Sequence, residues 1–139
     1  MADYKFRYFQ APREQNGKVV YVSIPLIDIV INYKRGQMLN VLALVDSGAS
    51  VNLFPASLGE KLGINIRKRK KQKIAGIGDI QIESFFHEGV GIFIEGNKLE
   101  TNAYFSYQQQ IPLLGQNGFF DKCSKVLFKR REEEIIITI

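Results

Sequence analysis

The sequence predicts an all-β domain in which short strands close into a barrel, together with one or two short helices. Runs of β-branched and aliphatic residues recur along the chain, and turn-forming Gly, Asn, Asp or Pro residues separate them. Of the 139 residues, 45% are hydrophobic, which suffices for one domain with one core. We therefore expect a single domain over residues 1–139, with residues 1–17 as an N-terminal extension or first strand and residues 125–139 as a C-terminal β-hairpin.

The N-terminal half is expected to consist mainly of strands. Asn16-Gly17 is a typical hairpin turn sequence, and the third strand carries Asp46 at its end. Pro55 and Gly63 frame a helix over residues 55–62. The expected strands are residues 18–24, 28–33 and 38–45, followed by an extended segment at residues 52–54.

The C-terminal half continues this alternation of strands and turns. Gly76 and Gly78 lie between two strand-like segments, which predicts a hairpin. A short helix is expected over residues 117–122. The expected strands are residues 64–67, 72–75, 80–86, 91–94 and 99–105, and a final hairpin pairs residues 125–128 with residues 134–139.

The composition argues against several classes of function. Cys123 is the only cysteine, so it cannot form an internal disulfide, and His87 has no second histidine with which to bind a metal. We therefore expect neither a metal site nor a cofactor. No apolar run approaches the ~20 residues that span a bilayer, and the N-terminus does not resemble a signal peptide. A cytoplasmic protein that does not bind membranes is expected.

The segment that begins at Asp46 carries the most information about function. Asp46 follows an apolar strand and enters a turn of small residues, Ser47, Gly48, Ala49 and Ser50. Gly48 allows the backbone to approach a ligand or another chain closely, and the Ser47 hydroxyl both donates and accepts hydrogen bonds. A carboxylate in this position favours catalysis. The alternative is an ordinary turn, in which Asp-Ser-Gly is common.

Three motifs occur in an order that is typical of one family. Residues 46–49, Asp-Ser-Gly-Ala, resemble the active-site loop D-[ST]-G-[AS] of aspartic proteases. Residues 73–78 are similar to a glycine-rich flap, and residues 111–120 to a late hydrophobic-hydrophobic-Gly motif with its short helix. Together the motifs resemble the retropepsin-like (retroviral-type) aspartic protease family. The helix at residues 55–62 is longer than in compact viral members, so the chain is similar in style to cellular and prokaryotic single-domain members.

The resemblance implies a single-lobed acid protease fold and a peptide hydrolase. Aspartic protease chemistry needs two carboxylates that share a proton, and this chain has one Asp-Ser-Gly sequence. The simplest completion is a homodimer, in which Asp46 of each subunit meets on a two-fold axis and activates a water against an extended peptide or protein substrate. Ser47 would bond across the axis, and Gly48, Ala49 and Ser50 would support the loop.

The resemblance also assigns roles to two later segments. The hairpin would be a flap that closes over the substrate, formed by Ala75, Gly76, Ile77 and Gly78. The alternative for this segment is a plain exposed hairpin. The wall of the pocket and its support would come from Leu113, Leu114, Gly115, Gln116 and Asn117.

The sequence departs from the viral pattern at one pair of positions. Viral members often place an acid four residues after the catalytic Asp and an Arg after the Leu-Leu-Gly glycine, whereas this chain has Ser50 and Gln116 there. A hydrogen bond between Ser50 and Gln116 would preserve the join. Neutral groups contribute about 1 kcal/mol against about 2 kcal/mol for charged ones, so we expect a weaker join.

A basic run supports a different hypothesis. The formal net charge is +5, and residues 67–73 read Arg-Lys-Arg-Lys-Lys-Gln-Lys. Such a run would allow a non-proteolytic binding module on the same fold to contact protein or nucleic acid. The run contains no aromatic residue, which disfavours base stacking. A solvated edge that resists strand aggregation is the simpler explanation, and the protease hypothesis is favoured.

Overall fold

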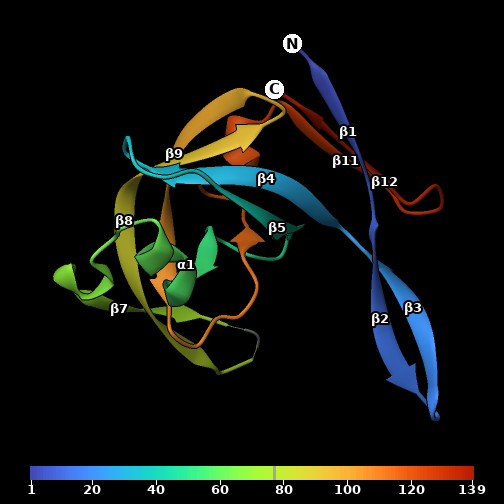
Figure 1. Cartoon of the computed structure of the whole chain (residues 1–139), viewed down its shortest axis with the longest axis horizontal. Coiled ribbons are helices and arrows are strands. Elements are labelled where there is room, and N and C mark those ends of the chain that lie inside the picture. Colours follow the sequence, from blue (N-terminus) through green and yellow to red (C-terminus); the bar gives the residue numbers. More distant parts are fainter. Residues whose placement is uncertain (77) are drawn as a thin grey trace.

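The computed structural model describes residues 1–76 and 78–139, and strands dominate it (Figure 1). Within these residues six strands close into a barrel, because the sheet order β4-β5-β10-β6-β9-β8 is joined end to end by the pairing of β4 with β8. The predicted all-β closed barrel is therefore confirmed. The barrel strands are β4 (Leu26–Tyr33), β5 (Leu39–Val45), β6 (Leu53–Pro55), β8 (Gln81–Ile94), β9 (Asn97–Ser106) and β10 (Leu113–Leu114).

The remaining strands extend from this barrel. β7 (Lys71–Ala75) pairs with β8 and forms the free edge of the barrel sheet. A three-stranded sheet has the order β1-β12-β11, and a two-stranded hairpin joins β2 to β3 (Figure 1). These strands are β1 (Asp3–Arg7), β2 (Phe9–Gln15), β3 (Lys18–Ile24), β11 (Lys125–Lys129) and β12 (Glu134–Thr138).

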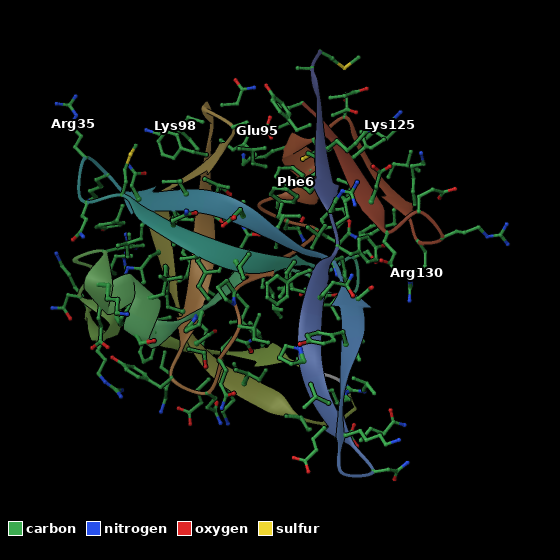
Figure 2. All side chains as sticks on the ribbon, turned by 45° about the vertical axis from the view of Figure 1, so that its right-hand side comes forward. Phe6, Arg35, Glu95, Lys98, Lys125 and Arg130 are labelled. Carbon is green, nitrogen blue, oxygen red and sulfur yellow. The ribbon has the colours of Figure 1, made fainter. Side chains whose placement is uncertain are left out.

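Alternating side chains of the strands fill one hydrophobic core. Ile27, Ile29 and Ile31 of β4 are all but fully buried, whereas Asp28 between them is exposed, as the two-residue period of a strand requires. The terminal sheet shares this core, since Ile135 and Ile137 of β12 are fully buried in it. Phe6 of β1 packs against the core from the same side (Figure 2).

The helix prediction is confirmed in position and shortened at both ends, to α1 (Ala56–Lys61). The strand predicted at residues 64–67 is wrong. Ile64 and Ile66 are buried, but this segment pairs with no described strand, and Ile66 starts the short 3-10 helix η1 (Ile66–Lys68). An apolar alternation predicts which residues are buried, but it does not show that their backbone pairs in a sheet.

Two further differences concern continuity. The strands predicted at residues 80–86 and 91–94 are one strand, β8, which is interrupted by a bulge between Glu88 and Val90. Gly89 takes a left-handed φ of +79° there, and its carbonyl accepts a hydrogen bond from the Lys34 backbone N–H (2.9 Å). This glycine therefore lets one strand continue through a bulge. The helix predicted at residues 117–122 is only the 3-10 helix η2 (Phe120–Lys122).

We predict that β12 is indispensable for folding. Ile135→Ala or Ile137→Ala removes a fully buried side chain, which typically costs about 2–5 kcal/mol through lost contacts and an unfilled cavity. Leu127→Ala on the paired strand β11 is the matched control, because Leu127 is 40% exposed. Urea denaturation measures the free energies of unfolding. Equal values for the core and control variants would contradict this placement of the tail.

Candidate active site

The turn after β5 fixes the position of Asp46. β5 runs parallel to β10, and the Asp46 backbone N–H donates to the Leu114 carbonyl (3.0 Å). The side chain is half-buried, and its Oδ1 accepts a hydrogen bond from the Gly48 backbone N–H (2.9 Å). The Ala49 N–H donates to the Asp46 carbonyl (3.1 Å). The carboxylate is thus held by its own turn, while Ser47 and Gly48 are exposed.

Asn52 and Gly115 lock this turn against the segment after β10. Asn52 is fully buried; its Oδ1 accepts from the Gly115 backbone N–H (3.0 Å), and its Nδ2 donates to the Asn102 carbonyl (3.0 Å). Gly115 has no room for a side chain, because a Cβ there would lie 2.2 Å from the Val51 carbonyl oxygen. Sequence reasoning missed Asn52, although a polar residue next to the apolar Leu53-Phe54 pair is a pattern that indicates a buried hydrogen-bonding role.

The expected hydrogen bond between Ser50 and Gln116 is not the one that joins the two segments. Gln116 Nε2 donates to the Ser47 carbonyl (2.8 Å) and Asn117 Nδ2 to the Ser50 carbonyl (2.9 Å). The backbone N–H groups of the same two residues donate to the Ala49 and Ser50 carbonyls (both 2.9 Å). The join therefore uses backbone acceptors of the loop, for which the side chain at position 50 is irrelevant.

A groove of about 610 Å³ opens between the Asp46 turn and the β7–β8 hairpin. Of the residues predicted from the sequence, those that line it are Asp46, Gly48, Ala49, Ser50, Ala75, Gly76 and Leu113. Ile77 lies outside the described residues. The predicted residues that do not line the groove are Ser47, Gly78, Leu114, Gly115, Gln116 and Asn117. The lining residues that were not among the predicted site residues are Val51, Leu53, Ile74, Ile80, Ile82 and Gln109.

The β7–β8 hairpin is held over the groove. Ile74 pairs with Ile82 across the two strands, and both side chains line the groove. The Gly76 N–H donates to the Ile80 carbonyl (2.7 Å) near the tip. Gly78 has a left-handed φ of +74° there, a conformation that glycine adopts without strain.

Polar contacts tie the base of this hairpin to the barrel. The Glu83 N–H donates to Gln108 Oε1 (3.0 Å). Lys71 Nζ lies 2.9 Å from Glu83 Oε2, and this hydrogen bond and charge lower the pKa of Glu83. The Arg67 guanidinium stacks on the rings of Tyr107 (4.4 Å) and Phe85 (5.6 Å). Two cations of the basic run thus already have partners in their own chain.

The remaining titratable candidates lie outside the groove. His87 is buried in β8, with Nε2 2.9 Å from the Ile66 carbonyl oxygen. Burial, with a smaller effect from Asp121, raises the pKa of the Cys123 thiol to about 11, so the thiol is protonated at neutral pH and is no nucleophile. Asp46 is the only acidic residue among the described residues that line the groove.

The likeness of this chain to known proteins lies in its fold. No protein-family profile matches the sequence, and no curated protein matches it. A solved structure described as a retropepsin-like aspartic protease from Rickettsia conorii aligns with 98% of this chain and 91% of its own, with a TM-score of 0.66 and 15% identity. The chain has the retropepsin-like fold.

A viral protein supports the same assignment. EIAV protease, solved in complex with the inhibitor HBY-793, aligns with 67% of this chain and 82% of its own, with a TM-score of 0.50 and 21% identity. The Rickettsia protein thus aligns with more of this chain than the viral protein does. In the part of the chain that the structure describes, no helix is long and apolar enough to cross a membrane.

We predict that Gly115→Ala displaces the Asp46 turn. The added Cβ would lie 2.2–2.8 Å from the carbonyl oxygen, the carbonyl carbon and the amide nitrogen of Val51. Because these backbone atoms cannot rotate away as a side chain can, the free energy of unfolding should fall by at least about 3 kcal/mol. The control is Gly96→Ala, since Gly96 has a left-handed φ of +88° and open space around it; its cost is about 1–2 kcal/mol. Thermal unfolding ranks the stabilities of the two variants, and the reverse order would contradict the close approach of Gly115 to the Val51 backbone.

Proposed function

We propose that the chain is a homodimeric aspartic endopeptidase that cleaves extended peptide segments, with water activated between two Asp46 carboxylates, one from each subunit. The observation that carries the proposal is a single carboxylate, held in a fixed turn, at an otherwise neutral and largely apolar groove of peptide-binding size. Proteolysis by carboxylates needs two of them. A second copy of the chain supplies the second carboxylate most simply.

The reaction follows from a pair of carboxyl groups that share one proton. The ionised Asp46 accepts a proton from a water while that water's oxygen attacks the peptide carbonyl carbon, and the protonated Asp46 gives its proton to the carbonyl oxygen. The tetrahedral product has two hydroxyl groups. It collapses when one hydroxyl returns its proton to a carboxylate and the leaving nitrogen takes a proton from the pair, which breaks the C–N bond and regenerates the starting pair.

The surrounding residues are proposed to hold this pair and the substrate. Ser47 is exposed beside Asp46, where its hydroxyl would bond across the two-fold axis. Gly48 would present its carbonyl to the substrate backbone, and the small Ala49 would allow close approach. Apolar lining residues would receive aliphatic substrate side chains; they are Val51, Leu53, Ile74, Ile80, Ile82 and Leu113.

The β7–β8 hairpin is proposed as the flap, through Ala75, Gly76, Ile77 and Gly78. Its apolar residues Ile74 and Ile82 face the groove, and the left-handed Gly78 lies in its exposed turn. A lid of this kind would exclude water from the reacting bond.

The alternative, a binding module that acts through residues 67–73, is not favoured. Arg67 stacks on two aromatic rings, and Lys71 pairs with Glu83. β7 is the free edge of the sheet, and charged side chains on such an edge prevent pairing with other chains.

The first prediction of this proposal concerns Asp46. Asp46→Asn retains an oxygen that can accept from the Gly48 N–H and should keep the fold, but it cannot exchange a proton, so cleavage of apolar peptides should fall by about 1,000-fold or more. The rate of the wild-type chain should pass through a maximum with pH, because neither a fully ionised nor a fully protonated pair works. Mass spectrometry of peptide products measures both. Equal cleavage by the variant would assign the activity to another group.

Mixing subunits tests the shared site. After exchange with a tenfold excess of Asp46→Asn chains, wild-type chains should retain about a tenth of their activity, because nearly all of them then lie in mixed dimers. An equal excess of an unrelated inactive protein is the control. Unchanged activity after the exchange would mean that each chain works alone.

A further prediction separates the flap from a passive hairpin. Gly78→Val places a β-branched residue at a left-handed φ, so turnover should fall at least about tenfold, while the melting temperature should fall no further than it does in Gly96→Val. Gly96→Val is a matched control, because Gly96 also has a left-handed φ and open space but lies in the β8–β9 turn. Similar turnover for the two variants would contradict the flap.

A further inference from the structure

The hairpin of β2 and β3, residues 9–24, forms an arm that stands apart from the barrel. Its two strands pair with each other and with no other described strand, and both views show it projecting beyond the body of the molecule (Figures 1 and 2). Asn16 and Gly17 at its tip both have left-handed φ values, 52° and 75°, which is typical of the tight turns that build stiff, twisted hairpins.

The arm exposes apolar side chains on a structure that lacks a covering layer. Val19 is 65% exposed, Tyr21 67% and Phe9 39%. Tyr21 pairs with Pro12 across the hairpin. Because alternate residues of a strand point to the same side, Val19 and Tyr21 share one face, while Val20 and Val22 lie on the other. An isolated two-stranded hairpin is marginally stable in water, and one with apolar residues on both faces indicates that something packs against it.

The base of the arm is fixed next to the Asp46 turn. The Val45 N–H donates to the carbonyl of Pro25, the residue that ends the arm (3.0 Å). Glu133 in the β11–β12 turn accepts hydrogen bonds from Ser23 Oγ (2.8 Å) and Gln10 Nε2 (3.3 Å). One of the contacts that fix the base of the arm therefore lies one residue away from Asp46.

We propose that the arm binds the second copy of the chain and holds the homodimer together, an inference that rests on the proposed function. A partner that brings its own Asp46 to this one must approach the exposed Ser47-Gly48 turn, and it then lies beside the base of the arm. In a two-fold dimer the same contact occurs twice, since each arm reaches the other subunit. The arm continues the surface on which the catalytic pair already requires a partner.

The chemistry of the arm fits a protein surface of this kind. The centre of a protein interface is more apolar than the rest of the surface and is enriched in aromatic residues, which Phe9 and Tyr21 of the arm provide. The tip carries charges of both signs, Arg13, Glu14 and Lys18, which does not suit a polyanion. The terminal strands β1, β12 and β11 already pair within one chain, whereas the unpartnered arm carries three exposed apolar residues, Phe9, Val19 and Tyr21.

The test removes apolar surface from the arm without touching the groove. Val19→Ser combined with Tyr21→Ser should leave the subunit folded, because both side chains are exposed, and should raise the dimer dissociation constant on the order of 100-fold. Met38→Ser is the control, since Met38 is 55% exposed but precedes the opposite end of β5 from Asp46. Sedimentation velocity over a concentration series measures assembly, and circular dichroism checks the fold.

A second measurement uses a reporter that leaves the arm apolar. The chain contains no tryptophan, so Tyr21→Trp gives a single indole on the arm. Its emission should move to longer wavelength on dilution, with the same midpoint as dissociation in sedimentation. Met38→Trp should show no such shift. An indole at position 21 that is equally exposed in monomer and dimer would overturn the inference.

The outcomes distinguish the two proposals. Equal dimer affinity for the arm variant and the wild-type chain would overturn the role of the arm and leave the dimeric protease intact. A stable wild-type dimer that loses its affinity with the arm variant, yet cleaves no peptide, would support the arm and remove the protease. A wild-type chain that stays monomeric at the highest attainable concentration would remove the dimer, and both proposals with it.

Discussion

The hydrogen bond between the Asn52 side chain and the Gly115 backbone is the contact on which the site depends. It joins the Asp46 turn to the segment after β10, 63 positions apart in the chain, at a point where no side chain fits on Gly115. Both partners are buried, so loss of either leaves an unsatisfied polar group that costs about 1–3 kcal/mol. The Asp46 N–H donates to the carbonyl of Leu114, the residue next to Gly115. The backbone that carries the carboxylate is therefore fixed by contacts with a distant part of the chain.

How far the sequence predicts this structure depends on the kind of information each residue carries. The strand with alternating Ile27, Ile29 and Ile31 and the turn at Asn16-Gly17 were predictable, because periodicity and turn chemistry are local properties. Residues 64–67 were assigned to a strand because an apolar alternation does not reveal whether the segment pairs in a sheet or turns into a short helix. The replacement for the viral ion pair was also missed, since Gln116 bonds to a backbone carbonyl, and backbone acceptors leave no mark in a sequence.

The same distinction divides the groove. Its glycines and its acid come from motifs with recognisable spacing, whereas Ile74, Ile82 and Leu53 are apolar residues within strands. An isoleucine that lines a groove and one that fills the core look alike in sequence, because both satisfy the same two-residue period. Which isoleucine faces the groove depends on how the β7–β8 hairpin packs relative to the Asp46 turn. Specificity for substrate side chains is therefore the property that the sequence reveals least.

In the proposed mechanism, folding of one subunit and assembly of the active site depend on different parts of the chain. The core, including Ile135 and Ile137 of the terminal sheet, is complete within one chain, whereas the groove contains one carboxylate where the proposed reaction needs two. If the proposed dimer forms, folding and activation would therefore use separate residues. In the proposed dimer the arm can change in apolar surface without disturbing the core, because it packs outside the barrel, and through Pro25 it remains anchored to the strand that carries Asp46. The affinity between subunits, rather than the chemistry of the carboxylates, would then set the protein concentration at which proteolysis begins.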